Sequence, residues 1–432
     1  MTAIGLDYGT SHCSAGIVLN GNARVLPLED GRSLLPSVLW APNVRFELDL
    51  DPAGRLRTEG ARFAALAFGE AALARYLDAP GKGYYVKSPK SFLGAPGLPD
   101  EVRERFVRLV AAMLARVRVA TEAAMQAPVT AAAIGRPVNF QGPAGSVENE
   151  SAVAMLKAAA TMAGLPEVEF LYEPLAAAFE YEARLNAEQR VLVIDVGGGT
   201  TDCSFVRVGP DRAEQSDRQD DVLGHSGERI GGNDYDQALA LRLAVPRLGW
   251  QAERRRGLPV PNHYFIDAIS INDVNAQARF YASATRERLH ELAAEVQGTR
   301  DLERLISLQE NRGSYQLIRQ FELAKIALST SDPVPCALEF LEARLRLDVT
   351  RADLRLASER LLEHLHDTVR DALVQGGSKP DVVYLTGGMA QSPVVRAHLE
   401  RLLGTLPVLD SDHFASVTEG LSLHAARCFT AR

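Results

Sequence analysis

Residues 191–202 combine carboxylates, glycines and hydroxyls at a spacing that suits phosphate chemistry. An apolar run leads into Asp195, Gly197, Gly198, Gly199, Thr200, Thr201 and Asp202. Glycines after a strand permit a tight turn whose successive N–H groups point at one anion. A carboxylate beside a phosphate is favourable when a hard cation such as Mg²⁺ lies between them. The stretch therefore predicts a phosphate loop, although a plain hairpin would also use glycines in its turn.

A second stretch, residues 4–18, repeats this order near the start of the chain. An apolar run is followed by Asp7, Gly9, Thr10 and Ser11, and then by a second apolar run. A strand–loop–strand unit that is used twice indicates a duplicated molecule with two lobes. We expect one loop from each lobe to face a shared triphosphate, with Asp7 and Asp195 on opposite sides of it.

The composition is that of a globular protein and argues against some partners. The chain has 432 residues, 46% of them hydrophobic, which is enough for two domains with their own cores. Its net charge of −8 disfavours general binding to nucleic acids or anionic membranes. No apolar run approaches the ~20 residues that span a bilayer, and the first strand begins too early for a signal peptide. The four cysteines match no zinc spacing, so we expect free thiols in a reducing cytoplasm.

Strands and helices alternate along the chain, which favours an α/β fold. Apolar runs predict strands at 23–28, 36–40, 130–135, 168–171, 202–208, 336–341, 344–349 and 381–385. Helical periodicity predicts helices at 100–126, 150–163, 175–185, 230–249, 271–296, 302–329, 350–375, 393–403 and 417–428, with breaks near Gly298 and Gly313. We expect Asp100 and Thr350 to cap their helices. Residues 41–97 read as less regular, 209–229 as a polar segment, and 251–263 as an exposed connection with arginines at 254–256.

These motifs, together with Leu-Thr-Gly-Gly at 385–388, resemble the superfamily of actin, hexokinase and heat-shock-protein ATPases. Within it, the chain is most similar to the nucleotide-binding domain of DnaK-type heat-shock-protein-70 chaperones. The resemblance rests on residues 4–11, 172–178, 191–202, 229–236 and 385–388, in the family's order and over almost the whole chain. It implies an actin-like ATPase fold: two lobes, each a mixed five-stranded sheet flanked by helices (a duplicated ribonuclease-H-like motif), around an ATP cleft.

The resemblance also implies a division of the chain. Residues 1–187 would form the first lobe and 188–380 the second, which would include a helical insertion at about 251–312. Residues 381–432 would carry an adenosine-binding loop and a crossing helix that returns to the first lobe. That helix and the one near 173–185 would act as the hinge, and Pro137 as a switch between the lobes.

The family's site residues transfer to positions in this chain. Mg²⁺ would be held, largely through its waters, by Asp7, Asp195, Glu173 and Asp202, with K⁺ as a further candidate cation. The phosphates of ATP or ADP would lie against Gly9, Thr10, Ser11, Gly197, Gly198, Gly199, Thr200, Gly231 and Gly232. The catalytic group would comprise Lys90, Glu173, Asp195, Asp7 and Thr200, with Lys90 orienting the attacking water and offsetting charge on the transferred group.

Lys87 is the rival of Lys90 for the catalytic role. Pro89 disfavours a helix through both residues, so we expect both lysines on a loop or strand edge. The spacing to Gly94 favours Lys90. Either lysine could instead be a solvated loop charge.

The adenosine side departs from the family pattern. The resemblance assigns it to Glu322, Lys325, Ile326, Ser329, Gly387, Gly388 and Gln391. Ile326 and Gln391 stand where the family has arginines whose guanidinium planes sandwich the base. Each such contact is worth about 0.5–2 kcal/mol, so we expect weaker ATP binding than in a full chaperone.

The chain stops at Arg432, directly after its last expected helix, where these chaperones continue into a peptide-binding domain. With its longer insertion, it resembles the short, ATPase-only bacterial relatives of the YegD type. The implied function is a chaperone-like cytoplasmic ATPase. It would hydrolyse Mg-ATP slowly to open and close its lobes for a protein partner or co-chaperone.

Three alternatives stay open at this stage. They are a small-molecule, sugar-type kinase, an actin-like filament-forming protein, and a nucleotide sensor without turnover. A kinase needs a carboxylate base aimed at a substrate hydroxyl, and we assign no residue to that role. We expect a monomer that binds neither nucleic acid nor membrane.

Overall fold

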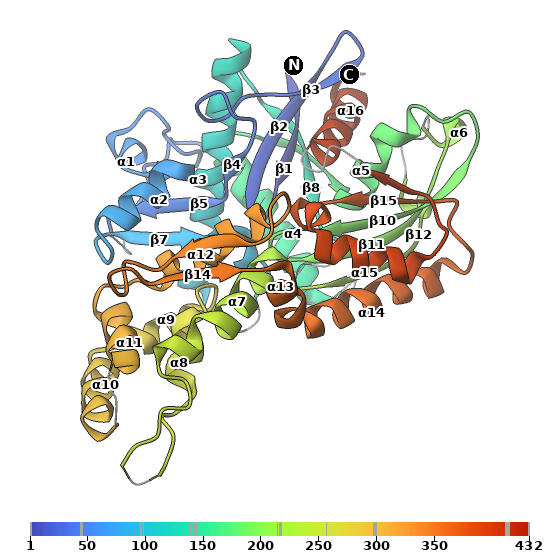
Figure 1. Cartoon of the computed structure of the whole chain (residues 1–432). Helices are drawn as coiled ribbons and strands as arrows, with labels where there is room; N and C mark the ends of the chain where they lie inside the picture. Colours follow the sequence, from blue (N-terminus) through green and yellow to red (C-terminus); the bar gives the residue numbers. More distant parts are fainter. Residues whose placement is uncertain are drawn as a thin grey trace.

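The computed structural model describes residues 2–430 except 44–45, 96, 98, 139, 141–145, 214, 216–217, 256, 297–299 and 411–414. Two mixed β-sheets flanked by helices form its centre (Figure 1), which is the predicted α/β class. Among the described helices, none combines the length and the apolar character that a membrane span requires. Arg256 and Gly298, which were singled out above, lie outside the described residues.

The first sheet has the strand order β3-β2-β1-β8-β9, with β4 paired to β2. Its strands are β1 (Ala3–Tyr8), β2 (His12–Leu19), β3 (Asn22–Val25), β4 (Leu35–Pro36), β8 (Ala131–Arg136) and β9 (Glu167–Tyr172). β1 runs antiparallel to β2 and parallel to β8. The turn from β1 to β2 is the first acid-bearing loop, so Asp7 lies one residue before the end of β1.

The second sheet repeats this arrangement, in the order β12-β11-β10-β15-β16. Its strands are β10 (Gln189–Val196), β11 (Thr201–Val208), β12 (Val222–Glu228), β15 (Val382–Thr386) and β16 (Val408–Asp410). β10 runs antiparallel to β11 and parallel to β15. Asp195 lies one residue before the end of β10, as Asp7 does in β1. The repeated strand–loop–strand unit is therefore confirmed.

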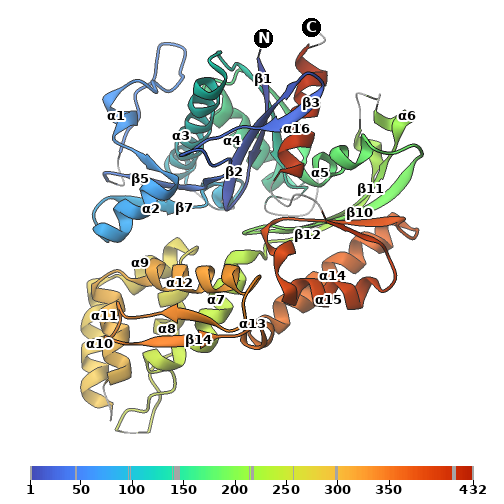
Figure 2. The same ribbon diagram turned by 45° about the horizontal axis from the view of Figure 1, so that its top comes forward.

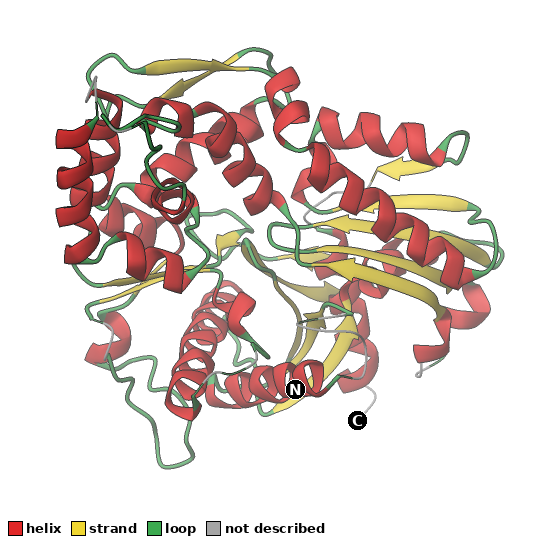
Figure 3. Cartoon of the chain, turned by 90° about the horizontal axis from the view of Figure 1, so that it is seen from below, coloured by secondary structure: helices red, strands yellow, loops and turns green. Residues whose placement is uncertain are grey.

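Helices cover the sheets and bury apolar cores against them, as the view from below shows (Figure 3). α3 (Asp100–Met125) and α4 (Val147–Met162) share one core with the first sheet. α7 (Gly232–Leu243), α14 (Glu359–Gly376) and α15 (Pro393–Leu403) share another with the second. Short segments α6 (Pro210–Ala213), η2 (Gln219–Asp221) and η3 (Val245–Leu248) complete the second half.

The stretch 41–97 is more regular than predicted. It contains α1 (Ala61–Ala64), α2 (Gly69–Asp78), η1 (Pro89–Phe92) and a small sheet of β5 (Val38–Ala41), β6 (Ala67–Phe68) and β7 (Tyr84–Lys87). The helix α2 escapes sequence reasoning because it starts at a glycine and lacks a side-chain cap. Lys90 lies in η1, a single 3₁₀ turn that accepts Pro89 at its first position. The predicted polar segment 209–229 contains β12.

The insertion of the second half is helical. The stretch 251–312 contains α8 (His263–Ile269), α9 (Val274–Phe280), α10 (Ser283–Glu295) and α11 (Arg300–Glu310). It is followed by α12 (Ser314–Ala327) and by the hairpin β13 (Val334–Ala337) and β14 (Arg346–Val349). Thr350 caps α13 (Arg351–Ala357), since its hydroxyl accepts the Asp353 N–H at 3.0 Å. The predicted helix 350–375 is two helices, which meet at Ser358. Asp100 is the first residue of α3 and does not cap it.

Two helices cross between the sheets, α5 (Glu173–Glu182) and α16 (Ser416–Thr430) (Figure 2). α16 packs on β1, β2 and β8, and α5 packs on β10 and β11. A Cβ at Gly420 would lie 1.8 Å from the Ala176 carbonyl oxygen, so the helices approach closely where this glycine lies. Ser14 and Thr418 hydroxyls, 2.5 Å apart, join α16 to β2. The crossing gives both halves a common contact beside the acid-bearing loops.

The halves also meet through three tyrosines of α2, β7 and α12. Figure 2 shows these three elements on the other side of the molecule from α5 and α16. Tyr76 of α2 stacks on Tyr85 of β7, with ring centroids 4.7 Å apart. Both rings meet Tyr315 of α12 edge to face, at 5.1 and 5.0 Å. The Tyr76 hydroxyl donates to the Arg312 carbonyl at 3.0 Å. The space between the sheets is therefore bridged at both ends.

A buried ionic cluster ties the end of α5 to the second sheet. The Arg218 guanidinium donates two hydrogen bonds to the Glu182 carboxylate, at 2.7 and 3.0 Å, and also pairs with Asp221. The side chains of Arg218, Glu182 and Asp221 are 3%, 1% and 0% exposed. Glu182 also accepts the Gly209 N–H at 3.0 Å. The cluster is fully paired, as buried charges must be.

His424 of α16 lies against this cluster and makes the fold sensitive to acid. Burial, and then the neighbouring Arg427 and Arg218, lower the pKa of His424 to about 4. An unfolded histidine takes up its proton near pH 6.5, so this residue's contribution to stability is full above that pH and is lost as pH falls towards 4. Between pH 7 and pH 4, the free energy of unfolding of the wild type should therefore fall by up to about 3 kcal/mol because of His424. The His424→Gln variant should lack this part of the decrease.

Urea unfolding of both proteins between pH 4 and 8 would measure this effect. The two stability curves should run parallel above about pH 7 and approach each other below pH 6.5. The comparison isolates His424 because the other groups that face it, Glu182, Arg218, Arg427 and Cys428, are the same in both proteins. Curves that stay parallel down to pH 4 would contradict the prediction.

Candidate functional site

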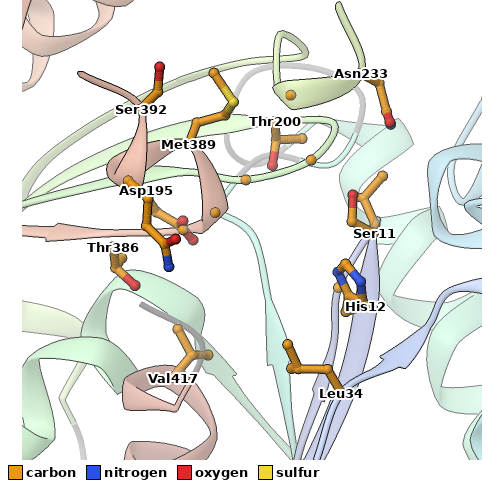
Figure 4. Close-up of a pocket in the computed structure, with 18 of the residues that line it drawn as sticks. Ser11, His12, Leu34, Asp195, Thr200, Asn233, Thr386, Met389, Ser392 and Val417 are labelled. Carbon is orange, nitrogen blue, oxygen red and sulfur yellow. The ribbon is translucent and has the colours of Figure 1, made fainter. Parts of the chain in front are cut away.

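A cavity of about 290 Å³ lies between the sheets and receives side chains from both (Figure 4). Most of the predicted site residues line it: Asp7, Gly9, Thr10, Ser11, Lys90, Glu173, Asp195, Gly197, Gly198, Thr200, Gly232, Glu322, Lys325, Ile326, Ser329, Gly387, Gly388 and Gln391. Asp202, Gly199 and Gly231 are not among its lining residues. Asp202 pairs with Asp195 across β10 and β11 and is 4% exposed. It lies behind the cavity wall.

The two acid-bearing loops touch each other at the cavity. A Cβ at Gly198 would lie 1.6 Å from the Ser11 hydroxyl oxygen, and one at Gly199 would lie 2.5 Å from Thr10 Cγ2. Larger residues at these positions would push the loops apart. The glycines of the second loop therefore serve close approach to the first loop as well as turn geometry.

The backbone of both loops leaves a distinct set of donors. The amides of Gly9 and Gly197 close their own turns, donating to His12 O at 3.0 Å and to Thr200 O at 2.9 Å. The Gly232 amide donates to Gly197 O at 2.9 Å and supports the second loop from behind. In the described part of the chain, the amides of Thr10, Ser11, Gly198 and Gly199 have no backbone acceptor. Together with the Thr200 amide, which also has no backbone acceptor in the described residues, they are candidate donors for an anion.

Two serines that sequence reasoning missed brace the first loop. The Ser37 hydroxyl donates to Gly9 O and the Ser88 hydroxyl to Thr10 O, both at 2.6 Å. Ser88 has a left-handed backbone, with φ of 55°, directly before η1. The loop is thereby tied to the segment that carries Lys90. Serines far from a loop in sequence give no local signal of such a contact.

Of the two lysines that were rivals for the catalytic role, Lys90 is the one that lines the cavity. Its Nζ lies 2.6 Å from Glu173 Oε1, and the two side chains are 6% and 11% exposed. Burial opposes the charged form, but Glu173 and Asp7 outweigh it and raise the pKa of Lys90, so the lysine is charged. Lys87 ends β7, is not among the lining residues, and acts electrostatically on Glu322 and Asp236. The two lysines thus differ in their positions, since Lys90 lines the cavity and Lys87 does not.

Carboxylates crowd the same wall. Burial, followed by the negative charge of Glu173, raises the pKa of Asp7 well above its usual range and that of Asp195 to about 8. Burial and Glu173 also raise the pKa of Asp202 to about 7, against a hydrogen bond from Thr200. Carboxylates in such a cluster favour a bound cation, which would restore their charged forms.

The donor set suits Mg²⁺ held through water and phosphate. The described residues contain no cluster of three His, Cys, Asp or Glu side chains placed to enclose a metal. Mg²⁺ commonly keeps several waters and uses one or two carboxylates beside substrate phosphates. Asp7 and Asp195 line the cavity as such a pair of oxygen donors.

The end of α12 forms another wall. Lys325 Nζ lies 2.8 Å from Asp236 and donates to the Gly232 carbonyl at 2.8 Å, so it is already paired. Arg319 donates to Glu322 at 2.8 Å. Although burial acts in the opposite direction, Lys87, Arg319 and Lys325 lower the pKa of Glu322 to about 2, so it is ionised. Asp236 lies within the segment 229–236 that we singled out, but its partner Lys325 becomes visible only in three dimensions.

Further lining residues were not predicted. They are His12, Leu34, Asn233, Thr386, Met389, Ser392 and Val417. Thr386 and Asn233 lie inside the motifs 385–388 and 229–236, although no role was assigned to them. His12 and Met389 directly follow the motifs 4–11 and 385–388, so a window one residue wider would have included them. Leu34 and Val417 carry no such signal because they are ordinary apolar residues of neighbouring elements.

Comparisons with known proteins agree with this geometry. A family model described as "Hsp70 protein" matches residues 103–245. The chain is 26% identical over 432 residues to a "Chaperone protein HscA homolog" of Delftia acidovorans, covering 98% of this chain and 58% of that protein. It is 25% identical over 433 residues to a "Chaperone protein DnaK" of Elusimicrobium minutum, covering 98% and 57%. The chain thus spans somewhat less than three fifths of the length of these curated relatives.

Proposed function

Because these matches make the chain an Hsp70-family protein with the actin-like ATPase fold, we propose that it binds Mg-ATP in the cavity and hydrolyses it slowly to ADP and phosphate. The observation that carries the proposal is the contact of the two acid-bearing loops, Gly198 against Ser11, beside the Lys90–Glu173 pair. One cavity thereby has free amides, carboxylates and a buried cation, as phosphoryl transfer to water requires.

The proposed roles follow the geometry. The amides of Thr10, Ser11, Gly198 and Gly199, with the Thr200 hydroxyl, hold the terminal phosphates. Asp7 and Asp195, which line the cavity, would hold Mg²⁺, and the bound ion would supply positive charge beside the phosphate oxygens. Lys90, fixed by Glu173, positions a water and stabilises negative charge on the transferred group. Glu322, Ser329 and the segment 387–391 form the adenosine side.

Hydrolysis would change how far the halves close. The crossing helices α5 and α16 would act as the hinge, and the contact of Tyr76, Tyr85 and Tyr315 would open or close with the bound nucleotide. In this scheme the lobes are residues 1–187 and 188–380, with 381–432 returning to the first. A protein partner would bind one of the two states, in the manner of a chaperone. The described cysteines are free, which fits a cytoplasmic setting.

Phosphate release from ATP tests the proposal. We expect slow release with Mg²⁺, loss of release with a chelator, and no acceleration by a panel of sugars. Acceleration by a sugar, with phosphate transferred to it, would establish a kinase instead. ATP-dependent pelleting in a centrifuge would support a filament. Nucleotide binding without any phosphate release would indicate a sensor and refute the hydrolytic part.

A further inference from the structure

One buried hydroxyl in the cavity has no partner. Ser392 lines the cavity and is 4% exposed, and its Oγ has no hydrogen-bond partner in the described part of the chain. Ser392 is the residue before α15, where a serine commonly accepts a helix N–H, yet its side chain makes no such bond. A buried hydroxyl without a partner is costly, so a ligand atom is the natural partner for it.

The segment that carries Ser392 is rigid. The Ser392 N–H donates to Met389 O at 2.9 Å, and the Ala390 N–H donates to Gly387 O at 3.0 Å, which closes the 3₁₀ turn η4 (Gly388–Gln391). Arg396 of α15 donates to Ala390 O at 2.6 Å and holds the turn against the helix. Figure 4 shows Met389 and Ser392 side by side on this segment. The hydroxyl is thus held in place before any ligand arrives.

Apolar and uncharged polar side chains make up much of the wall on the side of Ser392, and the ionised Glu322 lines the same cavity. Met389 lies against the start of α7, since a Cβ at Gly232 would be 3.4 Å from Met389 Cγ. Gln391 lines the same cavity, and Ile326 of α12, 56% exposed, lines it from another element. Lys325, the cation that lines this part of α12, is paired with Asp236. Apolar side chains with an amide and a hydroxyl suit a flat heterocycle better than another phosphate.

We propose that Ser392 and Gln391 recognise the purine base of the nucleotide, and that this chain takes adenine and guanine triphosphates with similar affinity. A hydroxyl and a carboxamide can each donate or accept a hydrogen bond. Adenine and guanine exchange donors and acceptors at their six-membered ring edge, so a pair of groups that can do either satisfies both bases. A wall of fixed donors would instead leave buried groups unpaired with one base and reject it strongly. The inference rests on the proposed nucleotide site.

Calorimetry with Mg²⁺ and four probes tests the inference: ATP, GTP, CTP and inorganic tripolyphosphate. For the wild type we expect ATP and GTP affinities within about tenfold of each other, since one hydrogen bond is worth roughly that factor or less. CTP, with its smaller base, should bind more weakly than either. Ser392→Ala should weaken ATP and GTP by about three- to tenfold and leave tripolyphosphate unchanged. Ser392→Thr, which keeps the hydroxyl, should retain most of the affinity.

A matched control is Ser378→Ala, because Ser378 bonds Gly376 O outside the cavity. It should leave all four affinities unchanged. ATP binding more than about a hundredfold tighter than GTP, or a Ser392→Ala protein that binds both purines like the wild type, would overturn the inference while leaving the proposed ATPase intact. A wild type that binds neither the nucleotides nor tripolyphosphate would refute the proposed function itself.

Discussion

Replacing Lys90 by alanine is expected to lower the rate of phosphate release from Mg-ATP by about 10²–10³-fold. The lysine is 6% exposed, its Nζ lies 2.6 Å from Glu173, and both side chains line the cavity. Its positive charge is positioned before the reaction, so it can stabilise charge that develops on the transferred group without reorganisation. Phosphate release at saturating ATP, measured with purified protein, gives the effect directly.

Lys87→Ala is the matched control for this prediction. Lys87 is three residues away, at the end of β7, and does not line the cavity. We expect it to keep hydrolysis within about threefold of the wild type at saturating nucleotide, because its charge acts on Glu322, Asp236 and His12 and its side chain does not line the cavity. Asp195→Asn should behave like Lys90→Ala and also weaken the dependence on Mg²⁺. Equal turnover in the wild type, Lys90→Ala and Asp195→Asn would show the catalytic assignment to be wrong.

Loss of Lys90 also leaves buried carboxylates without their cation, so folding must be checked separately. Circular dichroism and a thermal melt of each variant serve this purpose. A Lys90→Ala protein that is folded and still binds tripolyphosphate, but does not release phosphate, would place the defect in the chemical step. An unfolded variant would be replaced by Lys90→Arg, which keeps the charge but changes its geometry.

Arg218→Met is expected to lower the free energy of unfolding by about 3–5 kcal/mol. The variant removes the bidentate partner of Glu182 and one partner of Asp221, and both carboxylates are buried. A buried carboxylate without its partner is destabilising because the interior does not replace its hydration. Methionine fills much of the same volume, so the loss reports on charge more than on packing. Urea unfolding monitored by circular dichroism measures it.

Arg300→Met provides the contrast. Arg300 also pairs with a carboxylate, Glu342, but its side chain is 74% exposed. Water screens such a pair, and we expect little change in the free energy of unfolding. Because Arg218 links α5 to the segment that leads into β12, its variant should also unfold with lower cooperativity. Equal effects of the two substitutions would mean that the buried cluster does not hold the halves together.

Much of the site could be read from local sequence. Asp7 and Asp195 each follow an apolar run and precede glycine, so their positions at strand ends follow from short-range pattern alone. The same holds for Thr350, whose cap depends on Asp353 three residues later. Such features were predictable because the chemistry that fixes them lies within a few residues. The repeat of the whole unit then indicated two sheets.

The tertiary structure decided the features that join distant segments. Which lysine enters the cavity depends on a 3₁₀ turn braced by Ser88 and on Glu173 from another element. The pairing of Lys325 with Asp236 and the partnerless hydroxyl of Ser392 likewise depend on neighbours that are far away in the chain. Residue type and spacing determined the kind of chemistry, because turns and strand ends are local. Burial and pairing determined which groups are free to act, because both are properties of the packed molecule.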